Sequence, residues 1–284
     1  MTDTAVAPPT VRDVVAALDA RYPRAWAESW DRVGLVLGEF DTPVVRVLCV
    51  VDCVPETVEE AVAAGANLIV AHHPLLLKGV SSVAPDTYKG RIVHRLIKAE
   101  IALYVAHTNA DVANPGVSDA LAARLELGRL RPLVPATGAA EGEGRGAGRV
   151  GELAAPMTLA ELTGFAAGRL PPTAAGVRAA GDPERLIHTL AVCGGAGDSF
   201  LGAAAAAGAD AYLCADLRHH PASEHLAAGG TALLDVAHWA SERPWLDEVA
   251  GWLRAQFPVT ALVSDLDTDP WTVHAVSPDK EYLT

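Results

Sequence analysis

Apolar residues follow two different periods along this chain of 284 residues. Runs at residues 44–52, 67–73 and 101–108 are almost continuously apolar and rich in β-branched side chains, which is typical of strands buried on both faces. Between these runs, residues 55–65 and 88–100 repeat apolar positions at intervals of three and four, the spacing of a helix. This alternation predicts a mostly parallel sheet with helices on both faces.

Several of the predicted helices carry residues that mark their ends. Thr10 precedes a helical pattern over residues 10–23, and Ser118 is the expected cap of a helix that starts near residue 117. Pro55 stands in the first turn of the next helix and Gly65 follows its last turn, the usual places for these residues. The first part of the chain therefore has well-defined local signals.

The alternation resumes after residue 151. Predicted helices cover residues 157–170, 199–208, 221–230 and 242–257, and predicted strands cover residues 188–195, 210–220 and 231–239. Residues from Val259 onward have strand character and are expected to add an edge strand.

Glycine and small polar residues dominate the segment from Val134 to Gly151. Such a composition buries no core, so we interpret the segment as a flexible linker or an exposed loop. The expected organisation is a first α/β lobe over residues 1–133 and a second over residues 152–284. Residues 59–74 and 203–220 show a weak similarity, since each runs from a helix through glycine and a strand to a histidine-rich end. This similarity fits a duplicated unit and equally fits any two αβ units.

Composition excludes several classes of protein. A net charge of −13 makes duplex nucleic acid a poor partner, because like charges repel. No apolar run approaches the roughly 18–20 residues that span a bilayer, and the first residues do not resemble a secretory signal, so we expect a cytoplasmic protein. The four cysteines form no CxxC pair, and we interpret them as free thiols packed in a core rather than as zinc ligands or disulfides.

Histidines gather where the predicted strands end. Four strand ends carry six of the ten histidines, namely His72, His73, His107, His219, His220 and His238. Ligands of open α/β sheets bind beyond the carboxyl ends of the strands, so this edge is the expected functional site. His238 and Glu242 are four residues apart, which places both on one face of a helix, although a pair of this kind alone is more often a solvated ion pair.

Three imidazoles and two carboxylates at these ends suit metal binding. A single catalytic zinc takes three protein ligands, whereas five ligands suit two cations about 3.5–4 Å apart. Nitrogen and oxygen donors without thiolate accept zinc, iron, manganese, nickel or cobalt alike. The predicted ligands are His72, His73, Asp111, His238 and Glu242.

Two further features lie beside these residues. Asp235, three residues before His238, is a candidate to orient a ligand histidine through a hydrogen bond. The segment Gly194–Gly197 between a strand and a helix is interpreted as a tight turn in preference to a phosphate-binding loop, since it is neither GxGxxG nor followed by lysine.

Six motifs together resemble the NIF-three-like dinuclear-metal family, whose members are also labelled GTP cyclohydrolase 1 type 2 homologs. They are SWDRVGLVLG (29–38), AHHPLLLKG (71–79), HTNADVANPGVSDALA (107–122), CGGAGDS (193–199), ADLRHHPA (215–222) and DVAHWASE (235–242). The resemblance implies two similar α/β lobes, a two-metal site in the cleft between them, and ring-shaped homohexamers. It places the metal ligands on the same five residues, and His107 and His220 on further histidines near the site.

The chain departs from the pattern of this family at two places. Arg32 stands where the family usually has asparagine, and Cys214-Ala215-Asp216 stands where it usually has TGD. Both departures affect what lines the predicted site. The segment from Val134 to Gly151 is too short for the inserted domain of some members, so the chain resembles the compact form.

The expected function is that of a two-metal hydrolase acting on a nucleotide-like or phosphorylated small molecule, with GTP cyclohydrolase type 2-like activity as one case. Two cations lower the pKa of the attacking water, and Asp216 or His220 would move protons. The alternative is a non-catalytic, metal-binding, ring-forming interaction or regulatory protein, whose sites would be coordinatively closed. Trp239 and Trp245 are interpreted as anchors in the core or in a subunit contact.

Overall fold

The computed structural model describes residues 7–275, so residues 1–6 and 276–284 at the ends of the two predicted lobes lie outside it. The chain divides into two compact units. Within the described residues, the first unit combines residues 7–110 with 246–268, and the second combines residues 111–245 with 269–275. Each unit contains one sheet with helices on both faces, which confirms the predicted α/β class. The chain returns to the first unit near its C-terminal end, through residues 246–268.

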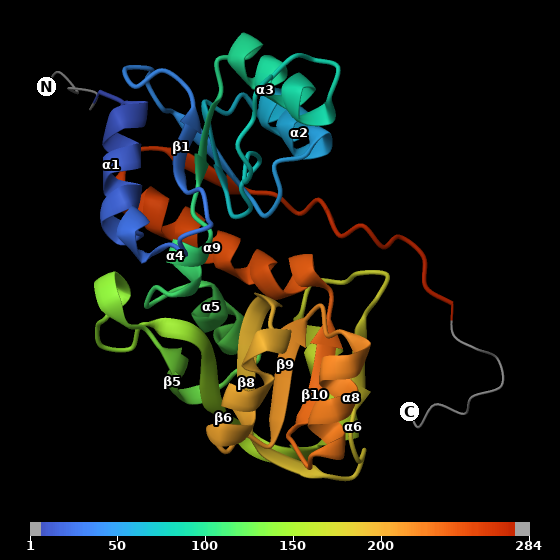
Figure 1. The fold of residues 1–284 in the computed structure, drawn as a ribbon. Helices are drawn as coiled ribbons and strands as arrows, with labels where there is room; N and C mark the ends of the chain where they lie inside the picture. Colours follow the sequence, from blue (N-terminus) through green and yellow to red (C-terminus); the bar gives the residue numbers. More distant parts are fainter. Residues whose placement is uncertain (1–6, 276–284) are drawn as a thin grey trace, which may run out of the picture. The chain divides into compact units, whose positions relative to one another are not determined.

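The sheet of the first unit is mostly parallel, as predicted (Figure 1). Its strand order is β1-β4-β3-β2-β11, and β1 alone runs antiparallel to its neighbour. The strands are β1 (Gly34–Leu37), β2 (Arg46–Val50), β3 (Leu68–Ala71), β4 (Ala102–Val105) and β11 (Thr260–Val263). The edge strand expected after Val259 is confirmed as β11, which pairs with β2.

Helices cover both faces of this first sheet. On one face, α2 (Pro55–Ala64) and α3 (Tyr88–Lys98) pack on alternate residues of β2, β3 and β4. On the opposite face, Tyr104 of β4 donates a hydrogen bond to Asp19 of α1 (Val11–Arg21). The predicted ends of α1 and α2 are confirmed. Thr10 forms a capping box with Asp13, Pro55 is the first residue of α2, and Gly65 ends α2 in the left-handed region at φ +66°.

The sheet of the second unit is mixed rather than mostly parallel. Its order is β5-β6-β8-β9-β10-β7, with β8, β9 and β10 parallel and the other three pairings antiparallel. The strands are β5 (Gly128–Pro135), β6 (Gly146–Thr158), β7 (Val177–Ala180), β8 (Leu186–Ala196), β9 (Ala211–Ala215) and β10 (Ala232–Val236).

The glycine-rich segment that we interpreted as a linker belongs to this second sheet. Residues 134–151 contain the end of β5, a short 3-10 helix (Gly138–Ala140) and the start of β6. Arg149 is only 1% exposed, and its guanidinium bonds both carboxylate oxygens of Asp119 and the carbonyls of Ala113, Gly146 and Gly148. The segment has few apolar side chains, so it is held in the sheet by backbone hydrogen bonds and by the buried ion pair of Arg149 with Asp119.

Helices also cover both faces of the second sheet. One face packs against α5 (Val117–Arg124) and α6 (Leu159–Arg169), and the other against α7 (Leu201–Ala206) and α8 (His219–Ala227). Ser118 does not cap α5 as predicted. Gly116 occupies the cap position and its N–H donates to Asp119, while the Ser118 hydroxyl accepts from the N–H of Gly194.

Helix α9 (His238–Gln256) contributes residues to both units and begins four residues before the predicted start. His238 and Glu242 therefore lie on one helical turn, as their spacing predicted. Trp239 and Trp245 are buried within the chain, which favours the core interpretation over subunit contacts. None of the described helices is long and apolar enough to cross a membrane.

The four cysteines are free thiols, and all of them are buried. Burial raises the pKa of Cys49, Cys53 and Cys214 to about 12, because the charged thiolate loses its hydration. Their interpretation as small apolar core residues is confirmed.

Candidate metal centre

Three histidines meet at the carboxyl ends of β3 and β4 in the first unit. The parallel register pairs Ala71 with Val105, so the residues that follow these two strands leave the sheet side by side. His72, His73 and His107 have ring centroids 5.1–5.5 Å apart, and one nitrogen from each lies within 4.8 Å of the other two. We call these three residues the histidine cluster.

Each imidazole in the histidine cluster is oriented through its Nδ1 atom. The Nδ1 of His72 lies 2.9 Å from the carbonyl oxygen of Ala106, that of His73 lies 2.8 Å from Asp52, and that of His107 lies 2.9 Å from Asp31. A carbonyl or carboxylate oxygen only accepts, so Nδ1 must carry the hydrogen. In a neutral imidazole the lone pair then resides on Nε2. Metal-binding histidines have the same arrangement, because a hydrogen bond from one ring nitrogen leaves the other to bind the metal.

The acceptors that orient these imidazoles are themselves held in place. Asp52 also accepts from the hydroxyl of Thr268 at 2.5 Å, and Asp31 accepts from the backbone N–H and the hydroxyl of Thr108 at 3.0 and 2.5 Å. Burial alone would raise the pKa of Asp31, but the hydrogen bonds from His107 and Thr108 outweigh it and lower the pKa below its ordinary value. Asp31 is therefore an ionised acceptor at neutral pH.

Arg32, the first departure from the family pattern, lies beside this support. Its side chain is exposed and donates to the carbonyl of Asp31 at 2.6 Å, and its backbone N–H donates to the Asp31 carboxylate at 2.7 Å. Arg32 thus stabilises the loop that holds His107.

A second group of ligand atoms lies at the carboxyl ends of β9 and β10 in the second unit. His238 begins α9 two residues after β10, and its Nε2 lies 3.0 Å from Oε1 of Glu242, one turn further on. The Nδ1 of His238 lies 2.7 Å from the carboxylate of Asp216, which directly follows β9. We call His238 and Glu242 the helix pair.

The geometry of the helix pair suits a shared cation. Two donor atoms that each lie about 2.1 Å from a cation, at right angles, are about 3.0 Å apart. The same separation also suits an imidazolium ion pair, so the distance alone does not decide between them. Glu242 is only 3% exposed, and a buried carboxylate needs a positive partner.

Gly195 at the end of β8 packs directly against the helix pair. A Cβ at this position would lie 2.3 Å from Oε1 of Glu242 and 3.1 Å from Nε2 of His238, and the backbone has φ +71°. The N–H groups of Gly194 and Gly195 donate to the hydroxyls of Ser118 and Ser241, so they serve the local turn rather than a phosphate. The glycines leave room for the two side chains of the helix pair.

Asp111 is the last residue of α4 (Thr108–Asp111) and the first residue of the second unit, and it is half-buried. Burial first, and then the charges of Asp111 and Glu242 among others, raise the pKa of the Cys193 thiol well above its ordinary value. Asp111 and Glu242 thus both act electrostatically on this thiol, and the role of Asp111 as a ligand stays a prediction.

Other predicted residues lie elsewhere in the second unit. His219 and His220 are exposed at the start of α8, with ring centroids 5.2 Å apart. The contact with a ligand histidine that we assigned to Asp235 is made by Asp216 instead. Asp235 accepts from Arg178 and from the N–H of Leu217.

Sequence reasoning missed the residues that orient the histidine cluster. Asp52 stands two residues after β2, so the strand-end rule that selected the histidines would also have found it. Asp31 and Thr268 lie in irregular segments far along the chain from their partners, and no pattern in the sequence points to them.

Two α/β units whose strand ends carry histidines and carboxylates define a class of candidate metal-binding proteins. Residues 9–270 match the Duf34/NIF3 (NGG1p interacting factor 3) family, and the chain belongs to this family. The motifs quoted above therefore indicated the family correctly.

Relatives in other organisms support this assignment. A protein from Streptomyces coelicolor named "GTP cyclohydrolase 1 type 2 homolog" is 55% identical over 276 residues, which cover 95% of this chain and 96% of that protein. One from Mycobacterium tuberculosis with the same name is 37% identical over 366 aligned positions, covering 92% of this chain and 96% of that protein. Since this chain has only 284 residues, that alignment includes residues it lacks, in agreement with a compact form.

Solved structures share the fold. A hypothetical protein from Staphylococcus aureus has a TM-score of 0.85 with 28% identity, covering 94% of this chain and 100% of that one. A Bacillus cereus protein related to NIF3 has a TM-score of 0.87 with 24% identity, covering 95% and 100%. The second likeness concerns the fold alone.

Proposed function

We propose that this protein is a metal-dependent hydrolase whose dinuclear centre is formed by His72, His73, Asp111, His238 and Glu242. Its substrate class is a nucleotide-like or phosphorylated small molecule. One observation carries the proposal: in both units, histidines at strand ends have Nδ1 bonded to a carbonyl or carboxylate oxygen, which orients the imidazole, and Nε2 of His238 lies 3.0 Å from a carboxylate oxygen of Glu242. Joining the histidine cluster with the helix pair in one centre is part of the proposal.

The donor set of this proposed centre contains nitrogen and oxygen atoms. Such a set suits two ions of zinc, iron, manganese, nickel or cobalt. The nearby Cys193 is held as a neutral thiol by its raised pKa and does not compete as a thiolate. His107 offers a further imidazole beside His72 and His73. When bound, two divalent cations supply a lowered pKa for water and a positive charge for developing anions.

The chain's own residues would orient the reaction. Asp216 bonds Nδ1 of His238 and so fixes the orientation of this imidazole. Asp31 and Asp52 fix two imidazoles of the histidine cluster in the same way. We propose that Asp216 or the exposed His220 takes or returns a proton, since a proton-transfer group needs only hydrogen-bond reach. The name of the relatives makes GTP the first substrate to assay.

Elemental analysis of protein purified without chelator tests the metal centre. We expect about two divalent ions per chain. Glu242→Gln and His238→Ala should each lower this ratio, whereas His188→Ala, which removes an exposed histidine of β8, should leave it unchanged. A ratio near zero in the unaltered protein would contradict the proposal.

Assays of metal-loaded protein against GTP and a panel of phosphoesters test the hydrolase. Turnover that is lost with Glu242→Gln and kept with His188→Ala supports it. Absence of turnover with two ions bound would instead favour the alternative, a non-catalytic metal-binding protein.

Assembly and location complete the proposal. From the family resemblance we propose a homohexamer, which light scattering at micromolar concentration would contradict by showing a monomer. The free, buried thiols suit a reducing compartment such as the cytoplasm.

A further inference from the structure

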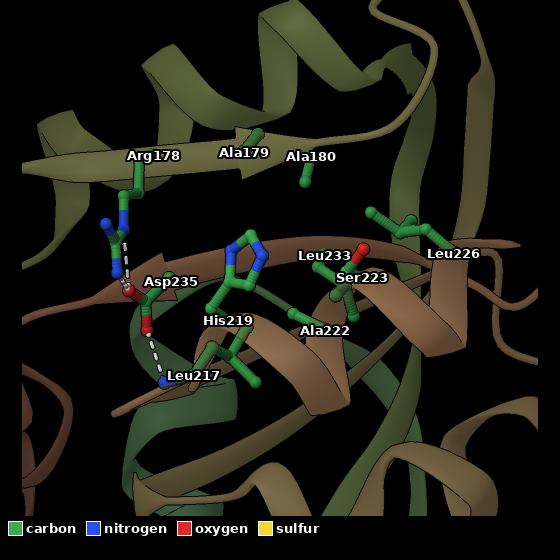
Figure 2. A pocket seen from close by; sticks show the side chains of 10 residues that line it. All are labelled: Arg178, Ala179, Ala180, Leu217, His219, Ala222, Ser223, Leu226, Leu233 and Asp235. Atoms are coloured by element: carbon green, nitrogen blue, oxygen red, sulfur yellow. Dashed lines mark hydrogen bonds and ion pairs between the residues drawn. The ribbon is translucent and has the colours of Figure 1, made fainter.

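A cavity of about 430 Å³ lies in the second unit between the edge strand β7 and helix α8, with β10 beneath it (Figure 2). This volume falls within the usual range of small-molecule sites. The apolar part of its lining consists of Ala179, Ala180, Leu217, Ala222, Leu226 and Leu233. The cavity therefore has a largely aliphatic interior.

The cavity exists because α8 packs loosely on the sheet. None of the nine residues of α8 is buried, and Ala222 and Leu226 only partly cover the core. Of the two alanines of β7, Ala180 faces the space and its side chain is too short to fill it, while its cross-strand neighbour Leu233 of β10 forms a buried floor (Figure 2). Small residues on a strand and a shallowly seated helix thus leave a preformed space.

Polar groups lie along the cavity and include one ion pair. Arg178 of β7 bonds the Asp235 carboxylate through Nε at 2.7 Å and Nη2 at 2.5 Å, and Asp235 also accepts from the N–H of Leu217 (Figure 2). The negative charge of Asp235 is therefore already compensated. His219 and Ser223 of α8 also line the cavity.

The remaining hydrogen-bonding capacity favours an acceptor on the ligand. Among the described residues, no group other than Asp235 accepts from the Arg178 side chain, which is 76% exposed, so its Nη1 can still donate. The Ser223 hydroxyl and the His219 imidazole can donate as well. His219 and Ala222 belong to the first turn of α8, the positive end of its dipole, and Arg218 provides no side-chain cap there.

We propose that this cavity binds a small monocarboxylate with an aliphatic or aromatic body. The apolar body would lie among the alanine and leucine side chains, and the carboxylate would accept from Arg178, His219 and Ser223. A monoanion fits better than a phosphate, because the lining contains one arginine and no lysine, and the charge of this arginine is already shared with Asp235. The site does not depend on the metal centre proposed above.

Protein-observed NMR with hexanoate and benzoate, compared with hexanamide and benzamide, tests this site on the full chain. We expect the acids to bind with Kd values near 1 mM or below, and the amides about tenfold more weakly. The shifted backbone signals should belong to β7, α8 and β10. The measurements use chelator-treated protein and His238→Ala, since carboxylates also bind metal ions, and the affinities should agree between the two samples.

Two variants locate the binding. Ala222→Trp places an indole in the cavity from a helix without buried residues, and it should abolish binding of acids and amides while circular dichroism stays unchanged. Arg178→Gln should remove the preference for acids over amides. Arg185→Gln, which changes an exposed arginine outside the cavity, is the matched control and should bind as the unaltered protein does.

Three results would overturn the proposal. The first is the absence of any spectral change at about 10 mM acid, which is roughly ten times the expected Kd. The second is equal affinity for acids and amides, and the third is binding that survives Ala222→Trp. If the probes fail to bind and Ala222→Trp also reduces the particle mass in light scattering, a second copy of the chain covers the cavity instead.

Discussion

The histidine cluster of the first unit and the helix pair of the second each follow the carboxyl ends of parallel strands in their own sheet, but they obtain their geometry in different ways. His72, His73 and His107 follow strands in irregular backbone, and each relies on an acceptor from another segment. His238 and Glu242 share one helical turn, so the helix itself sets their separation. The histidine cluster depends on long-range contacts, whereas the helix pair depends on local backbone and on Gly195.

Gly195→Val should have the largest effect, and it acts on the helix pair. The new Cβ would overlap Glu242 and the backbone would be strained at positive φ, so we expect more than 100-fold weaker metal binding and a loss of stability of about 1–3 kcal/mol. Metal titration and urea unfolding measure the two effects. Gly202→Ala, in α7 with no atom near its Cβ, should bind metal normally. Unchanged metal affinity in Gly195→Val would show that the helix pair is not a ligand site.

Removal of the carboxylates that orient the imidazoles should lower metal affinity less than Gly195→Val does, and by different amounts in the two regions. Asp52→Ala frees the His73 ring, and we expect metal affinity to fall roughly 10–100-fold. Asp216→Ala frees one side of His238, but the helix still directs this side chain, so the loss should be about tenfold or less. Asp41→Ala is the control, since its side chain is 88% exposed and forms a surface ion pair with Arg12. Equal losses in Asp52→Ala and Asp216→Ala would refute the difference between the regions.

The decline of stability at alkaline pH should be alike in the two units. Cys53 in the first unit and Cys214 in the second have a pKa of about 12 in the folded protein, above the ordinary value near 8.5 of an unfolded chain. Because the folded pKa is raised, their contribution is complete below about pH 8.5 and is lost as the pH rises toward 12, by at most about 1.4 kcal/mol per pH unit and thiol. Urea unfolding between pH 7.5 and 10.5 should show a shallower decline in Cys53→Ala and in Cys214→Ala. Parallel curves for variant and unaltered protein would contradict buried neutral thiols.

Local signals made much of the fold predictable. The first residue and the C-cap of α2 follow from the φ preference of Pro55 and the left-handed conformation of Gly65. The strand ends that carry the histidines follow from continuous apolar runs, and the helix pair follows from a spacing of four residues. Each of these signals lies within about ten residues of sequence.

Features that depend on distant partners were not predictable. The start of β6 has few apolar side chains, and its place in the sheet depends on pairing with β5 and β8 and on the ion pair between Arg149 and Asp119. The roles of Asp31 and Thr268 depend on contacts over 76 and 216 positions. Periodicity describes which face of an element is buried, but it carries no information on such partners.

The discontinuous first unit has a consequence for the order of events during synthesis. When β2, β3 and β4 have left the ribosome, the edge of β2 still lacks β11, which follows more than 150 residues later. At 5–20 residues per second this edge stays open for roughly 10–30 s. A nascent chain therefore exposes the unpaired edge of β2, next to Asp52, until translation is nearly complete. A chaperone can bind this edge during that interval, and a chain that terminates early would keep it unpaired.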